Sequence, residues 1–225
     1  MTKRLYIRKC VIVFLSVCIM GLGLCIMRIS CMGTDPFGGM NYSISELFGI
    51  PLGAVVAGVC VLCMIVTFFT RREFINFGMF ANMFLLGTSA DIWKKLFVTV
   101  LGHDITAFQG MEHFVLRFIM VCAGILTMVS FNSMCISANV GIGAYDGLGY
   151  IIEDLTHGKI TFKWARILCD AVCLVITFAF ASVRGTQWQI IGIGTVIMAL
   201  FTGPLITWIR EHVTNPFIVW VSREK

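Results

Sequence analysis

The sequence is poor in charge. Charged side chains make up 13% of the 225 residues, whereas soluble domains carry about 25%, so the chain lacks the charge to cover a water-facing surface. Hydrophobic residues make up 58%, and the mean hydropathy is +0.91. These values indicate an integral membrane protein whose main partner is the lipid bilayer. The net charge of +5 does not indicate nucleic-acid binding, because no basic face is left once the apolar spans are set aside.

The sequence also lacks the residue patterns of known catalytic and metal sites. Its four histidines are scattered near span ends with no ligand spacing, at His103, His113, His157 and His212. Cys60 and Cys63 form a CxxC, but no second CxxC or well-placed histidine completes a metal site. Thiols in apolar runs pack as small hydrophobic groups. We find no catalytic triad or phosphate-binding loop, and we therefore expect no enzyme activity, no metal and no cofactor.

Six apolar segments are long enough to cross a membrane, which takes about 20 residues. They run over about 10–29, 52–70, 74–93, 114–138, 164–183 and 188–209. The first has a basic flank like that of a signal peptide but no cleavage site of small residues, so we expect it to stay as a signal anchor. The expected fold class is an all-α polytopic membrane protein with six transmembrane helices in a single domain over 1–225.

The positions of lysine and arginine predict the orientation in the membrane. With the N-terminus inside, twelve of these residues fall on the inner side, namely Lys3, Arg4, Arg8, Lys9, Arg71, Arg72, Lys159, Lys163, Arg166, Arg210, Arg223 and Lys225. Five fall outside, namely Arg28, Lys94, Lys95, Arg117 and Arg184. This excess predicts that both termini are cytoplasmic, and an even number of spans agrees with it.

The two halves of the sequence resemble each other. GTDPF at 33–37 aligns with GIGAY at 141–145, and the match extends to Tyr42 with Tyr150. Further on, FINFGMFANMFLLG (74–87) aligns with IIGIGTVIMALFTG (190–203). We interpret the match as an internal duplication.

An odd number of spans in each half determines the orientation of the second half. With three spans in the first half, the second must enter the membrane from the opposite side, and such inverted-topology repeats are typical of secondary transporters. The expected parts are repeat 1 over about 10–93, a linker over 94–113, repeat 2 over about 114–209 and a cytoplasmic tail over 210–225.

A short helical pattern follows the Gly-rich break in each half. Apolar residues recur there at three- and four-residue spacing, which predicts a helix with one apolar face, but about a dozen residues are too few to span a membrane. Asp35 and Pro36 fit the cap and first position of a helix, while Gly143 fits a cap and Asp146 a first turn. Two interpretations stay open: capped helices on the membrane surface, or half-helices whose positive ends point into a central cavity.

Several motifs carry a family resemblance: MGTDPFGG, NMFLLG at 82–87 with Asp91 following, GAYDGL, WARILCD and IGIGT. With them the chain resembles the YczE/YyaS/YitT family of bacterial membrane proteins, from about Gly21 to Ile209. The resemblance implies about six spans and a bacterial plasma membrane location, and it carries no information about chemistry.

Ionisable groups at membrane depth are costly and mark candidate functional sites. Asp170 is the strongest candidate, since it falls about a third of the way into the fifth span. Arg166 lies four residues earlier on the same helix face, where the two can form an ion pair. The first half carries Val56 and Cys60 at the matching positions, so the halves are not chemically equivalent.

Four further polar residues complete the substrate- or ion-coupling candidates. Asp35 and Asp146 belong to the two short helix starts. Asn82 lies in the middle of the third span, where a hydrogen bond between helices is the alternative explanation. Asp91 falls near the end of that span, where it can reach the interface.

These features predict a secondary transporter or exporter of an unidentified small molecule or ion. The alternative is a non-transporting accessory or regulatory protein that supports another membrane system. Nucleotide-binding motifs are absent, so transport would be driven by gradients or by a separate ATPase. A homo-oligomer is compatible with the sequence.

Overall fold

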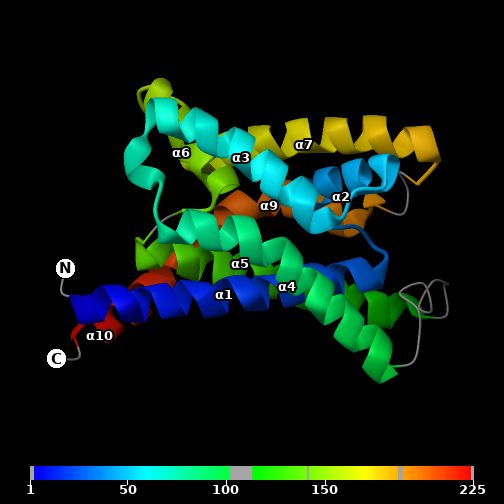
Figure 1. Cartoon of the computed structure of the whole chain (residues 1–225), viewed down its shortest axis with the longest axis horizontal. Helices are drawn as coiled ribbons and strands as arrows, with labels where there is room; N and C mark the ends of the chain where they lie inside the picture. The colour runs from blue at the N-terminus through cyan, green and yellow to red at the C-terminus, as the bar shows by residue number, and fades with distance from the viewer. Residues whose placement is uncertain (1–2, 102–112, 141, 187–189, 224–225) are drawn as a thin grey trace.

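The computed structural model describes residues 3–101, 113–140, 142–186 and 190–223. The described part of the chain is helical and has no strand (Figure 1). Its elements are α1 (Lys3–Ser30), α2 (Pro36–Phe48), α3 (Leu52–Thr70), the 3-10 turn η1 (Arg72–Phe74), α4 (Phe77–Leu101), α5 (Phe114–Ala138), α6 (Ala144–Leu155), α7 (Phe162–Arg184), α9 (Ile193–Ile209), the π-helical segment η4 (Arg210–Thr214) and α10 (Asn215–Arg223). Most of the expected linker, Gly141 and residues 187–189, at the start of the sixth expected span (188–209), lie outside the described residues.

Five of these helices are long and apolar enough to cross a membrane: α1, α3, α5, α7 and a continuous span over Ile193–Ser222. The sixth expected span corresponds to this last one. The third expected span corresponds to α4, which has 25 residues but is less apolar, because it contains Asn82, Asp91, Lys94 and Lys95. The fold is therefore an all-helical membrane protein with five spans that meet the apolar criterion.

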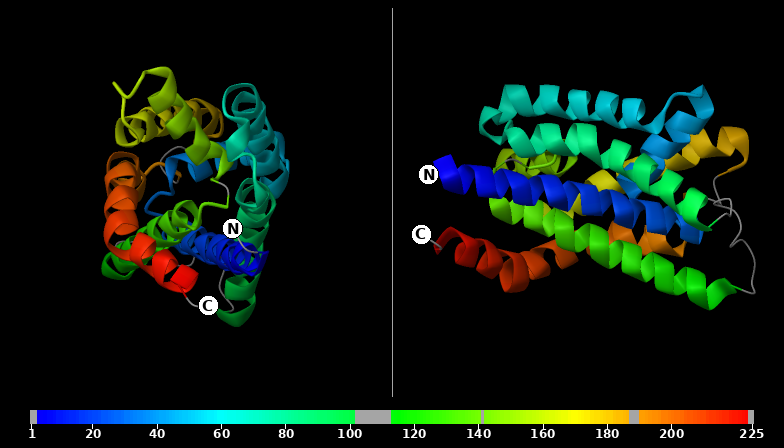
Figure 2. Two further views of the ribbon diagram at one scale, coloured as in Figure 1. Left: turned by 90° about the vertical axis from the view of Figure 1, so that its left-hand side faces the viewer. Right: turned by 60° about the horizontal axis from the view of Figure 1, so that its bottom comes forward.

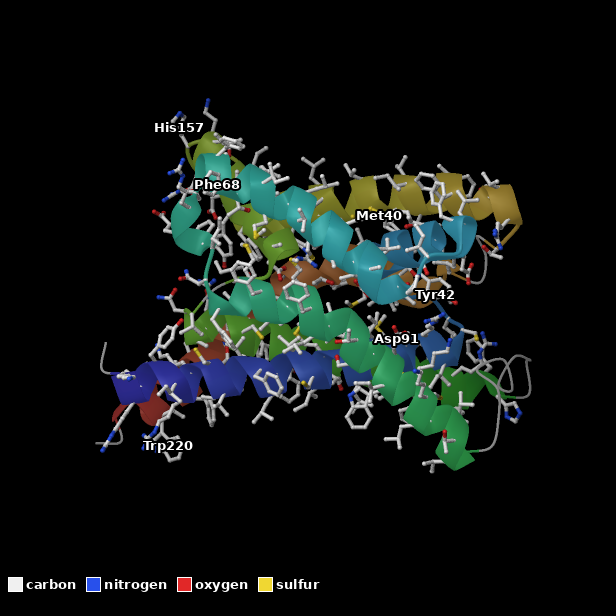
Figure 3. The ribbon with its side chains drawn as sticks, viewed as in Figure 1. Met40, Tyr42, Phe68, Asp91, His157 and Trp220 are labelled. Atoms are coloured by element: carbon white, nitrogen blue, oxygen red, sulfur yellow. The ribbon has the colours of Figure 1, made fainter. Side chains whose placement is uncertain are left out.

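The long helices run side by side, and the first residues of α1 and the last residues of α10 lie at the same end of the bundle (Figure 2). The short helices α2 and α6 lie toward opposite ends: Tyr42 on α2 is near one end and His157, which follows α6, near the other (Figure 3). Residues 210–223, expected as a tail, are helical instead, and Ile218 of α10 belongs to a buried apolar cluster that also contains residues of α1, α4 and α5.

Large apolar side chains cover the outside of the bundle. Phe69 on α3, Val115 on α5 and Val183 on α7 each leave at least 70% of their surface exposed. Such a surface is stable only against lipid, because a water-soluble protein rarely exposes so large an apolar area. Inside, three apolar clusters hold the helices together, and methionines such as Met27 and Met79 are fully buried in them.

Two backbone hydrogen bonds tie the halves to each other. The amide of Gly78 donates to the carbonyl of Val140 over 2.9 Å, and the amide of Gly194 donates to the carbonyl of Met32 over 2.9 Å. In the alignment of the two halves Gly78 matches Gly194, and the same GTDPF/GIGAY register matches Met32 with Val140. The same bond is thus made twice, each time from one half to the other.

Candidate functional site

The helix start at Asp35 has the expected cap. Asp35 is the N-cap of α2, its Oδ2 accepts from the amide of Gly38 over 2.8 Å, and Pro36 follows at the first helical position. Asp35 leaves only 6% of its surface exposed, whereas Phe48 at the other end of α2 leaves 60%. The helix therefore begins in the interior of the protein and ends at its surface.

The helix start in the second half is arranged in the same way. Gly143 is the N-cap of α6, and Asp146 lies in its first turn. Asp146 is 5% exposed and Leu155 at the far end is 68% exposed, so α6 also begins inside and ends outside. The capped starts predicted from the sequence are confirmed, and both lie in the interior.

The two helix starts meet. The ring of Phe37 in α2 stacks on the ring of Tyr145 in α6, with centroids 4.4 Å apart and planes 22° from parallel. Offset stacking of this kind adds about 0.5–1.5 kcal/mol beyond the burial of the rings. Since Phe37 and Tyr145 align in the two halves of the sequence, equivalent residues touch each other at the centre of the protein.

Arg166 lies at the centre of a buried charge cluster. Its Nη1 pairs with Oδ1 of Asp146, and its Nε lies 3.5 Å from Oδ1 of Asp170. The i,i+4 pair expected on α7 is therefore present, but Asp146 on α6 is the closer partner. Its guanidinium also lies over the ring of Tyr145, 4.3 Å from the centroid.

Neutral polar groups complete the cluster. The hydroxyl of Tyr145 donates to Oδ1 of Asp170 over 2.6 Å, and the thiol of Cys173 lies 3.5 Å from that hydroxyl. The amide of Asn132 on α5 lies 3.4 Å from Oδ1 of Asp146. Tyr145 and Asn132 were not among the sequence candidates. Asn132 could have been found in the sequence, because it is a polar residue inside an apolar span. Tyr145 could not, because its sequence context does not indicate that its hydroxyl forms a hydrogen bond.

Two carboxylate oxygens in this region remain without a partner. Oδ1 of Asp35 and Oδ2 of Asp170 are buried and accept no hydrogen bond from the described residues. Asp35 also interacts electrostatically with Asp170 and Arg166. Two of the three buried carboxyl groups, on Asp146 and Asp170, thus pair with Arg166, and the third, on Asp35, forms no ion pair among the described residues. The structure brings together four of the six candidates from the sequence: Asp35, Asp146, Arg166 and Asp170. Arg166 is also one of the twelve residues counted on the inner side, and the structure buries it in the interior.

The matching face of α3 is apolar. Val56, Cys60, Cys63 and Thr67 on α3 align with Arg166, Asp170, Cys173 and Thr177 on α7, and all eight are buried. The hydroxyls of Thr67 and Thr177 make the same bond, each to the carbonyl four residues earlier. The two helices are therefore built alike and differ in the two charged residues.

The last two candidates lie in different places. Asn82 is buried beside the start of α6, where a Cβ on Gly143 would be 3.2 Å from its Nδ2. Asp91 is half-buried on α4, where its charge acts on Cys25 together with those of Arg28 and Lys94. Asp91 thus belongs to the α2 end of the bundle (Figure 3) and not to the charge cluster.

Two cavities of unequal size lie toward opposite ends. The larger, of about 530 Å³, lies at the α6 end and is lined by Tyr150, Phe162, Lys163, Trp208, Arg210 and neighbouring residues. The smaller, of about 20 Å³, lies at the α2 end and is lined by Arg28, Gly38, Tyr42, Leu52, Lys94 and neighbouring residues. Tyr42, Leu52 and Lys94 align with Tyr150, Phe162 and Arg210. Equivalent residues thus line an open cavity at one end and a nearly closed one at the other.

Two residues that line the smaller cavity form a cation–π contact. The guanidinium of Arg28 lies 3.6 Å from the ring centroid of Tyr42. At the larger cavity Arg210 instead donates to the hydroxyl of Tyr150 over 2.6 Å, and Phe162 stacks on that ring with centroids 4.3 Å apart. Among the described residues, no group of three His, Cys, Asp or Glu side chains is placed to hold a metal ion.

Comparisons with known proteins identify relatives of unknown activity. Residues 7–211 match the family DUF6198, described as a "Family of unknown function". The "Uncharacterized membrane protein YczE" of Bacillus subtilis (strain 168) is 23% identical over 177 residues, which cover 78% of this chain and 72% of the relative. The "Uncharacterized protein YyaS" of the same organism is 26% identical over 207 residues, 91% and 90% of the two chains. No solved structure gives a significant match.

Proposed function

We propose that this chain, which belongs to the DUF6198 family, is a secondary transporter of a small polar solute in the bacterial plasma membrane. The observation that carries the proposal is the meeting of two half-helices, at Phe37 and Tyr145, beside the buried cluster around Arg166. Transporters place their substrate sites near the middle of the bilayer, at the starts of such interrupted helices.

The charges of the cluster support a binding role. Arg166, Asp146 and Asp170 are all less than 10% exposed, and a buried ion pair adds little net stability compared with apolar packing. The matching face of α3 packs without charges, so the fold does not need them at equivalent positions. We infer that the cluster is kept for binding a solute or its coupling ion.

We further propose that the two halves form an inverted-topology repeat that works by alternating access. The paired backbone bonds from Gly78 and Gly194, each crossing to the other half, support this relationship. The opposite directions of α2 and α6 (Figure 1) and the equivalent residues that line the two cavities also support it. In this scheme the α6 end is open and the α2 end closed, and the transported solute reaches the cluster from each end in turn.

An untargeted comparison of metabolites tests the proposal. Cells with the wild-type protein, with no protein and with Arg166→Ala at a verified protein level are compared for solutes inside and in the medium. We expect at least one solute to change its distribution with the wild type and not with Arg166→Ala. If no solute responds to the wild-type protein, the accessory or regulatory alternative takes the place of transport.

A further inference from the structure

We propose that Asp35 carries a proton in the resting protein and that the ion coupled to transport is H⁺. The coupling to H⁺ rests on the proposed transport function, and the protonation of Asp35 does not.

The charge balance of the interior leads to Asp35. Asp35, Asp146 and Asp170 are all buried, and Arg166 is the one guanidinium paired with any of them in the described chain. With all three carboxyl groups ionised, two negative charges would remain uncompensated in the interior of a membrane protein.

Two of the three carboxyl groups form an ion pair with Arg166. Asp146 pairs with Arg166 and lies beside the amide of Asn132. Asp170 accepts from the hydroxyl of Tyr145 and lies 3.5 Å from Arg166. Asp35 has only the amide of Gly38 on its Oδ2, while its Oδ1 has no partner among the described residues. Asp35 is thus the least compensated of the three, and neutralising it removes one buried charge.

The groups around Asp35 agree with this assignment. The helices around it carry many ionisable residues, among them Arg166, Cys169, Asp170 and Cys173 on α7, Tyr145 and Asp146 on α6, Tyr42 and Glu46 on α2, Cys25 and Arg28 on α1, Cys60 and Cys63 on α3, and Asp91, Lys94 and Lys95 on α4. Of these, the charges of Asp170 and Arg166 act on Asp35 and oppose each other. Arg28 lies over the ring of Tyr42. The α9 helix (Ile193–Ile209) contains no ionisable residue.

A proton fits the site better than a metal cation. Hard cations take about six oxygen ligands, and among the described residues no three acidic, histidine or cysteine side chains are placed to bind one metal ion. A proton needs one free oxygen, and Oδ1 of Asp35 is one. This oxygen is buried directly beside Gly38, which lines the smaller cavity.

The unpartnered oxygen of Asp170 provides the acceptor for the next step. A proton that leaves Oδ1 of Asp35 and binds Oδ2 of Asp170 leaves a carboxylate on the first group and neutralises the second. The neutral Asp170 then no longer attracts Arg166, whose guanidinium becomes more available to a solute. The transfer moves one proton and no electrons, and the net charge of the interior stays the same.

Infrared difference spectroscopy of the purified protein tests the protonation directly. At neutral pH we expect the C=O stretching band of a protonated carboxyl group in the wild type, which falls as the pH is raised. Asp35→Asn should lack the band, and Asp91→Asn, the matched control outside the cluster, should keep it. Asn caps a helix about as well as Asp, so the fold should persist. A wild type without the band, or a folded Asp35→Asn that keeps it, would overturn the proposal.

Two further measurements separate this inference from the function it rests on. The unfolding temperature should be the same in NaCl and in choline chloride; a rise with Na⁺ that Asp35→Asn abolishes would assign the site to a metal cation instead. In proteoliposomes containing a pH-sensitive dye, solute flux should move protons in the wild type and not in Asp35→Asn. Solute flux that moves no protons overturns H⁺ coupling alone, whereas absence of any solute flux overturns the transport function and leaves a band assigned to Asp35 as evidence for its proton.

Discussion

The rings of Phe37 and Tyr145 stack 4.4 Å apart, although 108 residues separate them in the sequence. They occupy the same position in the two halves of the chain, so the contact joins equivalent points of two similar units. In the proposed inverted repeat, the axis that relates the two units passes between these rings. The ion-paired charges lie beside this contact, and all of them come from the second half, on Asp146, Arg166 and Asp170.

Arg166→Ala should destabilise the protein more than Asp170→Ala does. Removing the guanidinium leaves both Asp146 and Asp170 without a cation, a loss of about 3–5 kcal/mol for a broken buried pair. Removing Asp170 leaves Arg166 paired with Asp146. Protein level in membranes and the unfolding temperature in detergent measure the difference. Equal losses in the two variants would show that Asp146 is not the main partner of Arg166.

Replacing the whole cluster by its counterpart from the first half should restore stability but not function. Asp146→Gly, Arg166→Val and Asp170→Cys together install the residues found at the matching positions 38, 56 and 60. A buried ionic triad replaced by apolar groups is often as stable as the original. We expect the triple variant to recover the protein level lost in Arg166→Ala and to show no solute flux. Normal flux in this variant would remove the cluster from the site.

Tyr145→Phe should weaken the site without breaking the stack. The change removes the hydrogen bond to Asp170 and keeps the ring against Phe37, so we expect a loss of about 1.5–3 kcal/mol, the range for a bond to a charged group. Tyr6→Phe on the exposed part of α1 is the control. Thermal unfolding of both variants gives the comparison, and an unchanged Tyr145→Phe would show that the bond contributes nothing.

Gly124→Ala should be destabilising where Gly58→Ala is not. A Cβ on Gly124 would lie 2.9 Å from the carbonyl oxygen of Gly23 on α1, while a Cβ on Gly58 meets nothing within 4 Å. Forcing the first pair of helices apart should cost about 1–3 kcal/mol, and the second change should add up to about 1 kcal/mol of helix propensity. Unfolding temperatures that shift in the same direction would contradict the close packing of α1 on α5.

The ends of α2 and α6 should be accessible from opposite sides of the membrane. Ile50 after α2 and Lys159 after α6 are both exposed, so Ile50→Cys and Lys159→Cys are suitable for labelling in a background without the native thiols. A membrane-impermeant maleimide added to intact cells should label the first, and the second only after the cells are opened. Labelling of both from one side would exclude the inverted repeat and the cytoplasmic position of both termini.

Local chemistry explains which parts of the site could be predicted. The cap at Asp35 and the pair of Arg166 with Asp170 depend on neighbours within four residues, so both could be predicted from the sequence. The closer partner of Arg166 could not be found in this way, because Asp146 lies on another helix and reaches Arg166 only through the packing of α6 on α7.

The same distinction applies to the fold. The apolar runs predicted the spans, whereas the helical end at 210–223 was missed, since its arginine and glutamate residues are typical of a tail in water. There Thr214 is buried beside Ser133 and Ser137 of α5, with its hydroxyl 3.0 Å and 2.7 Å from theirs.

The apolar face of α3 opposite the charged face of α7 has an energetic consequence. In the proposed alternating-access scheme, two identical halves would give two conformations that differ only by exchange of the halves, with equal free energies and equal populations when no ligand is bound. Ion-paired charges in only one half make the two free energies unequal, because Arg166, Asp146 and Asp170 have different surroundings in each conformation. A single resting conformation, here the one with the open cavity beside Tyr150, is then favoured before any gradient is applied.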